Sequence, residues 1–202
     1  MKIAFVVFEG LTTMDFLGVY DPVTRLKTMG FRDDIDWDIC ALVPKVTDTT
    51  GKLTIEATRI KPDLGEYDMF VVPGGMGGMV AQGDPEFIQW LQSGRNAAYK
   101  MAVCNGSIVM GHAGYLQGKK ATTNRNVFDQ LPALGAEVVR NRVVEDGDVI
   151  TAGGVSSSID LGLYLVGKIA GQEVMEKIKT QMEYNGFEQA NIEGFGEPLK
   201  MA

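Results

Sequence analysis

The sequence predicts an α/β domain in which helices cover both faces of a mostly parallel sheet. Short apolar runs rich in β-forming residues alternate along the chain with stretches of helical character. Several of these runs lack polar alternation, which is typical of strands buried on both faces. No Pro/Ser-rich linker or repeat divides the 202 residues, so we expect one domain over residues 1–202.

The first half of the chain carries the clearest elements. The run KIAFVVF near the N-terminus is continuously apolar and predicts a buried strand. Gly30 ends the first helical stretch, Pro44 closes the second strand, and Pro85 occupies the first position of a later helix. The expected strands are residues 2–8, 37–43, 68–73 and 100–103, with 53–57 as a half-exposed strand or hairpin arm, and the expected helices are residues 15–29, 85–96 and 106–113.

The second half is less regular. Asp146 and Gly147 form a hairpin signal between two short strands. The expected strands are residues 137–139, 142–144 and 148–151, the expected helices are residues 156–169 and 173–182, and a less regular tail begins at about residue 184. In a sheet of this kind, ligands are expected beyond the carboxyl ends of the strands.

Composition and charge exclude several function classes. The chain has 19 basic and 26 acidic residues, a net charge of −7, and its basic residues are scattered. Because phosphate neutralisation needs clustered Lys and Arg, we expect no nucleic-acid partner. The N-terminal apolar run has six residues and no later run approaches a membrane span. We therefore expect no signal peptide, no membrane contact and a cytoplasmic location.

The counts of cysteine and histidine limit the chemistry further. Cys40 and Cys104 lie far apart and form no CxxC motif, which predicts neither a metal site nor a disulfide. His112 is the single histidine, so a zinc site or a Cys-His pair would depend on it. It follows Cys104 by eight residues on the same expected helix, about 12 Å along the axis. A Cys-His dyad within one chain is therefore disfavoured.

Cys104 is the first candidate for chemistry. It follows a short apolar strand and precedes Asn105, Gly106 and Ser107 at the start of a helix, the arrangement of a nucleophile elbow. The unpaired N–H groups of the helix start favour a thiolate, so we expect them to lower the pKa of this thiol. The alternative is a buried, inert cysteine, which is our interpretation of Cys40.

Two further features are candidates for the same site. Residues 73–78 form a glycine-rich loop at the end of a strand, whose N–H groups could bind an oxyanion or simply form a turn. Asp15 follows the first strand and could reach Cys104 as a general acid/base. Thr12 and Asp15 also have the spacing of a helix capping box, which is the structural alternative.

These pieces resemble a known family along nearly the whole chain. The most specific stretch runs from Val103 to Ser107 and from Gly114 to Thr123, and weaker similarity covers residues 3–10, 14–18, 71–75, 102–118, 121–123 and 151–163. The chain is similar to the ThiJ/PfpI superfamily, which is related to class I glutamine amidotransferases. The resemblance implies a flavodoxin-like three-layer sandwich with a cysteine nucleophile elbow.

Within the superfamily, Asp15 together with Cys104 most resembles the isocyanide hydratases. The resemblance implies that Cys104 is the nucleophile and that Asp15 is the acid/base. It implies an oxyanion pocket from the backbone of Gly75 and Asn105. It further implies a homodimer with its interface near the site, a small-molecule substrate, and neither a metal nor an organic cofactor.

Two positions depart from the family pattern. Asn124 follows Ala121, Thr122 and Thr123 where many relatives carry a histidine, and Asn105 stands where isocyanide hydratases usually have threonine. The first departure disfavours Cys-His proteolysis, and the second bears on the substrate. Two other functions stay open: glyoxalase- or deglycase-like action on α-oxoaldehydes, and a non-catalytic cysteine redox sensor or ligand-binding protein.

Overall fold

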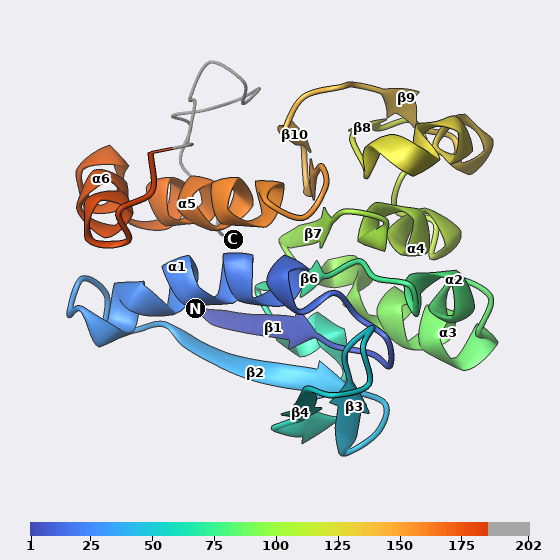
Figure 1. Cartoon of the computed structure of the whole chain (residues 1–202), viewed down its shortest axis with the longest axis horizontal. Helices are drawn as coiled ribbons and strands as arrows, with labels where there is room; N and C mark the ends of the chain where they lie inside the picture. The colour runs from blue at the N-terminus through green and yellow to red at the C-terminus, as the bar shows by residue number, and fades with distance from the viewer. Residues whose placement is uncertain (186–202) are drawn as a thin grey trace.

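The structure is a computed structural model that describes residues 1–185 (Figure 1). The expected tail from about residue 184 therefore lies almost entirely outside the described residues. Within these residues the main sheet contains β1 (Lys2–Val6), β2 (Asp36–Ala41), β5 (Arg59–Ile60), β6 (Met69–Val72), β7 (Tyr99–Val103), β10 (Val143–Asp146) and β11 (Val149–Ala152). Two small sheets pair β3 (Lys45–Thr47) with β4 (Thr54–Glu56), and β8 (Lys120–Ala121) with β9 (Glu137–Val138).

The strand order of the main sheet confirms the predicted α/β class. The order is β10-β11-β7-β6-β1-β2-β5, and each neighbouring pair is parallel except the antiparallel pair β10–β11 at one edge. That edge pair is the hairpin which Asp146 and Gly147 predicted. The expected arm at residues 53–57 is also a hairpin, since β4 pairs with β3 antiparallel.

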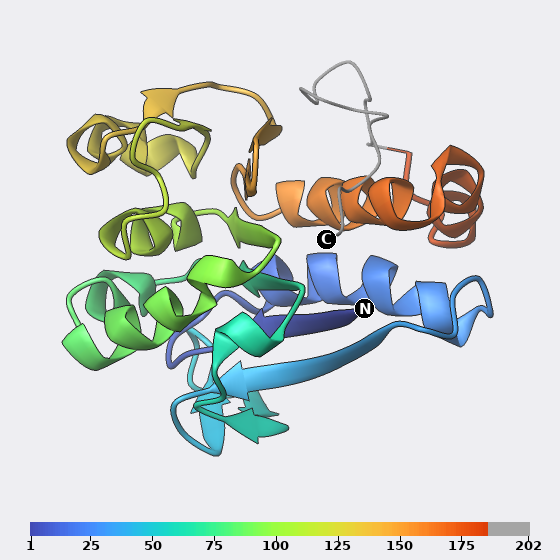
Figure 2. The same cartoon turned by 180° about the vertical axis from the view of Figure 1, so that it is seen from behind.

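Helices cover the sheet and bury its central strands. The α-helices are α1 (Thr13–Thr28), α2 (Gly78–Ala81), α3 (Pro85–Ser93), α4 (Gly106–His112), α5 (Ser157–Ala170) and α6 (Gln172–Gln181), and the 3-10 helices are η1 (Leu64–Glu66), η2 (Gly94–Asn96), η3 (Arg125–Gln130) and η4 (Pro132–Leu134). Both views show α1 lying alongside α5, while α3 and α4 form a separate group (Figures 1 and 2). Every residue of β6 and β7 is buried, as expected for strands covered on both faces.

The contact between α1 and α5 is close because glycines line it. A Cβ on Gly18 would lie 1.9 Å from Ser158 Oγ, and one on Gly162 would lie 2.7 Å from the Gly18 carbonyl oxygen. Ser158 Oγ donates to the Met14 carbonyl oxygen at 3.0 Å, which joins the first turns of the two helices. These contacts fix the position of the residues at the start of α1.

The chain order places three loops together at one end of the sheet. From β1 the chain runs outward to β2 and then returns to β6 on the other side of β1. The order of the strands therefore reverses between β1 and β6. Ligand sites of open α/β sheets lie at such a switch point, beyond the carboxyl ends of the strands. Gly75 and Cys104 lie in the loops that follow β6 and β7, and Asp15 lies in the first turn of α1, just after the loop that follows β1.

The sequence did not predict the short elements α2, β5, β8, η3 and η4. Each is six residues or fewer, which is too short for a periodic pattern. Over residues 1–185, no helix has the length and apolar character that a transmembrane segment requires.

Candidate active site

Cys104 occupies a strained turn between β7 and α4. Its φ of 57° lies in the left-handed region, which costs a residue with a Cβ about 1 kcal/mol or more. Four hydrogen bonds hold it there. Its N–H donates to the carbonyl oxygens of Ala152 and Gly153 at 3.0 and 2.9 Å. Its carbonyl oxygen accepts from Ser107 Oγ at 2.9 Å and from Thr123 Oγ1 at 3.0 Å.

Gly106 lets the helix begin directly against the neighbouring strand. A Cβ at this position would lie 2.5 Å from the carbonyl oxygens of both Val72 and Pro73, at the end of β6. No side chain fits there without moving α4 away. Glycine at this position therefore permits the close packing of strand and helix.

Asp15 is fully buried and lies against Cys104. Its Oδ2 accepts a hydrogen bond from the Gly74 N–H at 3.1 Å, and its Oδ1 is buried without a hydrogen-bond partner. A Cβ on Gly74 would lie 2.7 Å from Cys104 Cβ and 2.8 Å from Asp15 Oδ2. The three residues therefore converge around one point.

The capping-box alternative for Asp15 is wrong. Thr12 is the N-cap residue of α1, but its side chain makes no capping hydrogen bond. The Asp15 carboxylate accepts instead from Gly74, on the loop after β6. Asp15 therefore belongs to the candidate site rather than to its own helix start.

Burial shifts both titratable groups of the pair. The pKa of Asp15 is raised to about 6 by burial, against the opposing hydrogen bonds from Gly74 and Cys104. The pKa of Cys104 is raised to about 11, first by burial and second by the charge of Asp15. The Asn105 N–H at the helix start does lower the pKa of this thiol, as expected, but burial and Asp15 raise it by more, so the net shift is upward. The helix is seven residues long, and its N–H groups do not offset burial beside a carboxylate.

Gly75 and Asn105, the two residues whose backbone the resemblance gives to an oxyanion pocket, are joined by two hydrogen bonds. The Gly75 N–H donates to Asn105 Oδ1 at 2.8 Å, and Asn105 Nδ2 donates to the Gly75 carbonyl oxygen at 2.9 Å. The side chain of Asn105 thus occupies both polar groups of Gly75. The backbone N–H of Asn105 is directed at Cys104, where it lowers the pKa of the thiol.

Asn124 is a site residue that the sequence analysis missed. Its Nδ2 donates to Cys104 Sγ at 3.3 Å. The sequence analysis noted Asn124 only because many relatives have a histidine at this position. An isolated asparagine in a loop does not by itself indicate contact with a catalytic cysteine. Its contact depends on the path of the loop after β8, which no local pattern predicts.

An uncharged cavity of about 360 Å³ opens onto this group. Its walls are formed by Thr12, Gly75, Met76, Met79, Gln82, Cys104, Asn105, Ile108, Asn124, Asn126, Val127, Gln130 and Val155. None of these lining residues, all of which lie within residues 1–185, carries a charge. Cys104 is 6% exposed and reaches the cavity wall, so a small uncharged molecule could meet its sulfur.

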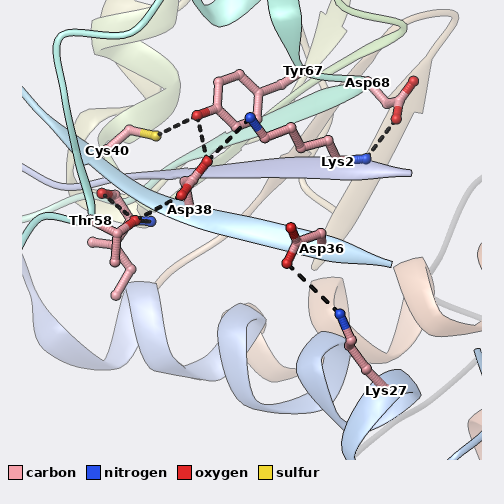
Figure 3. Close-up of polar contacts among 9 residues, drawn as sticks. Lys2, Lys27, Asp36, Asp38, Cys40, Thr58, Tyr67 and Asp68 are labelled. Atoms are coloured by element: carbon pink, nitrogen blue, oxygen red, sulfur yellow. Dashed lines mark hydrogen bonds and ion pairs between the residues drawn. The ribbon is translucent and has the colours of Figure 1, made fainter. Parts of the chain in front are cut away.

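The other thiol and the histidine lie elsewhere. Cys40 is fully buried in β2, and its S–H donates to Tyr67 Oη at 3.6 Å; Tyr67 in turn donates to Asp38, which pairs with Lys2 (Figure 3). This arrangement confirms a core role for Cys40. His112 is exposed at the last turn of α4. Over the described part of the chain, no group of three His, Cys, Asp or Glu residues could hold a metal ion.

Comparisons with known proteins agree with this geometry. The profile of the DJ-1/PfpI family matches residues 1–168. An isonitrile hydratase from Pseudomonas putida is 36% identical over 185 residues, which cover 91% of this chain and 78% of that protein. A ThiJ/PfpI family protein from Pseudomonas syringae superposes with a TM-score of 0.81 at 31% identity, covering 93% of this chain and 76% of that one.

A more distant structure shows the fold alone. DJ-1beta from Drosophila melanogaster superposes with a TM-score of 0.77 at 22% identity, covering 90% of this chain and 97% of that one. The family profile covers most of the chain, and the two Pseudomonas relatives are each more than 30% identical to it. The chain belongs to the DJ-1/PfpI family.

Proposed function

We propose that this protein hydrates a small, uncharged isocyanide to the N-substituted formamide, with Cys104 as nucleophile and Asp15 as acid/base. The observation that carries the proposal is the buried carboxylate of Asp15, which lies beside Cys104 on the other side of Gly74. Isonitrile is a synonym of isocyanide, so the similarity to the Pseudomonas putida isonitrile hydratase supports the same reaction.

The first step follows from where the proton lies. At neutral pH the pKa of about 11 keeps Cys104 a thiol, and the pKa of about 6 leaves Asp15 ionised. Asp15 accepts the thiol proton as Sγ bonds to the terminal carbon of the isocyanide, and it returns that proton to the same carbon. The carbon–nitrogen triple bond becomes a double bond, and the product is a thioimidate, Cys104–S–CH=N–R.

Hydrolysis completes the cycle. Asp15, ionised again, takes a proton from water as the oxygen adds to the thioimidate carbon, and the nitrogen receives that proton. The tetrahedral species then breaks its C–S bond, and the proton of its hydroxyl group goes to sulfur as R–NH–CHO leaves. One water is consumed and the carbon–sulfur bond is made and broken once, so the balance needs no oxidant or reductant.

Backbone N–H groups are proposed to stabilise the charge that develops in these steps. The N–H of Asn105 already points at the sulfur. The N–H of Gly75 donates to Asn105 Oδ1 in this structure, so it becomes available only when the Asn105 side chain rotates. The larger reach of asparagine at this position, compared with threonine, is therefore expected to affect substrate choice.

The cavity supports an uncharged substrate. Its apolar wall includes Met76, Met79 and Ile108, and its polar groups are amides and one threonine rather than ions. Burying a carboxylate or ammonium there without a partner would cost several kcal/mol. An alkyl or aryl isocyanide meets no such penalty.

The quaternary structure and location form part of the proposal. Met14 and Leu17 are 42% and 41% exposed in α1, on either side of Asp15 in the sequence, and Val155 is 39% exposed at the cavity wall. A second copy of the chain covering these apolar side chains would form a homodimer beside the site. Cys40 and Cys104 are both free thiols, which fits a reducing compartment such as the cytoplasm.

The test is turnover of an aryl isocyanide followed by absorbance, with the formamide identified by mass. The wild type and Cys40→Ala, which removes the other thiol, should turn over, while Cys104→Ala should give only the uncatalysed rate. Equal background rates for wild type and Cys104→Ala would refute the proposal.

The same preparation distinguishes the alternatives. Loss of methylglyoxal with formation of D-lactate would favour action on α-oxoaldehydes. Oxygen added at Cys104 by dilute peroxide, with no turnover of any electrophile, would favour a redox sensor.

A further inference from the structure

Asn124 contacts the reacting sulfur in a fixed orientation. It is the N-cap of η3, and its Oδ1 accepts the N–H of Asn126 at 3.0 Å while its Nδ2 donates to Cys104 Sγ at 3.3 Å. A flipped amide would place an oxygen against the sulfur and an NH₂ group against an N–H donor. The two partners therefore determine which end of the amide faces Cys104.

The NH₂ group of an amide can donate a hydrogen bond but cannot take up a proton. A thiolate is a better acceptor than a thiol, so the contact strengthens as the proton leaves the sulfur. Asn124 thereby opposes the burial and the charge of Asp15, both of which favour the neutral thiol. The charge of Asp15 is thus a target of this opposition as well as a proton acceptor in the proposed mechanism.

We propose that Asn124 is a third catalytic residue, whose amide stabilises the Cys104 thiolate during attack while Asp15 alone exchanges protons. The residue also lines the cavity, so it remains beside the sulfur when a substrate is present. The inference rests on the proposed function for its substrate. The contact itself acts on the sulfur whatever electrophile is attacked.

The matched variants are Asn124→Ala and Asn124→Asp. Aspartate keeps the oxygen that caps η3 and has nearly the same shape as asparagine. It loses the donor and adds a negative charge next to the sulfur. If Asn124 only caps η3, Asn124→Asp should leave the reactivity of Cys104 at the wild-type level, and Asn124→Ala should lower it. If Asn124 stabilises the thiolate, both variants should lower the reactivity of Cys104, and Asn124→Asp should lower it more than Asn124→Ala.

The readout is the second-order rate of alkylation of Cys104 by iodoacetamide at pH 8, measured on the Cys104 peptide by mass spectrometry. Loss of a hydrogen bond to a charged group should raise the thiol pKa by about one to two units. The rate should fall about three- to tenfold in Asn124→Ala, because a thiolate of higher pKa is also more nucleophilic. Asn124→Asp should be slower still, with both variants retaining the wild-type circular dichroism spectrum.

Either of two results would overturn the inference: an alkylation rate equal to wild type in Asn124→Asp, or an alkylation rate equal to wild type in Asn124→Ala. Alkylation needs no isocyanide, so the outcome is separate from that of the proposed function. If the predicted order appears while no isocyanide is turned over, Asn124 keeps its role and the assigned reaction is wrong.

Discussion

At the scale of single residues, Asp15 and Cys104 share one proton that lies mainly on sulfur at neutral pH. Burial raises the pKa of Asp15 to about 6 and that of Cys104 to about 11. Because the thiol has the higher pKa, it holds the proton before attack. In the proposed mechanism Asp15 is the base before attack and the acid after it. Activity near neutral pH is therefore expected to require ionisation of Asp15 rather than prior ionisation of the thiol.

This requirement predicts the pH dependence of kcat/KM for an uncharged isocyanide. Below the pKa of about 6, Asp15 is protonated and cannot accept the thiol proton, so kcat/KM should fall about tenfold per pH unit. Above it, kcat/KM should reach a plateau across neutral pH. Asp15→Asn should lower the plateau about 10²- to 10⁴-fold. A profile that instead keeps rising from pH 7 to pH 9 would show that thiolate formation limits the rate.

The same carboxylate should cost the protein stability. Between pH 3.8, the usual pKa of Asp, and about 6, the folded state holds a proton that the unfolded state has released. The free energy of unfolding therefore falls as pH rises through this window, by about 3 kcal/mol in total. Asp15→Asn keeps an oxygen for the Gly74 N–H and should be more stable than wild type.

Urea denaturation of both proteins at pH 5 and pH 7.5 checks this prediction. The gain of Asp15→Asn should be larger at pH 7.5. A variant that is less stable than wild type at both pH values would contradict it.

The residue scale also shows the limits of sequence reasoning. The position of Cys104 after a strand and shortly before Gly106 predicted the elbow, but local spacing alone favoured a capping box for Asp15. The choice depends on Gly74, a residue 59 positions away that donates to the carboxylate. The sequence missed the net rise in the Cys104 pKa for the same reason, since burial and the charge of Asp15, which outweigh the helix start, act through tertiary contacts.

At the scale of elements, the long strands and helices could be predicted because each has a continuous apolar run or a clear end signal. β1, β6 and β7 are buried runs, and Gly30 follows the end of α1 with a φ of 73°. The loop from β8 to η4 could not be predicted, because its short elements are held by contacts rather than by a periodic pattern. That loop carries Asn124.

Gly106→Ala tests how closely α4 must approach β6. The new Cβ would meet two carbonyl oxygens at 2.5 Å, so we expect about 1–3 kcal/mol of destabilisation and a lower kcat as the elbow moves. Gly83→Ala is the matched control, because its Cβ would meet only the Val80 carbonyl oxygen at 3.6 Å. Thermal unfolding and isocyanide turnover measure both effects; a Gly106→Ala protein as stable and active as the control would count against this packing.

At the scale of the whole molecule, the proposed homodimer would cover apolar side chains beside the site. We expect sedimentation equilibrium to give twice the mass of one chain. Leu17→Glu should shift the protein toward monomer, because it would place a charge in the interface. Ile60→Glu, at an equally apolar position 55% exposed on β5, should stay dimeric. A wild type that sediments as a monomer would refute the dimer.

The central claim is that the isocyanide carbon becomes bonded to Cys104 Sγ. The most direct measurement is the mass of the protein after acid quench during turnover, followed by peptide mapping. The account predicts an added mass equal to the whole isocyanide, located on the peptide that contains Cys104, and more of this adduct in Asp15→Asn if hydrolysis is slowed more than attack. Formamide produced at the full rate by Cys104→Ala, with no adduct on the wild-type peptide, would contradict it.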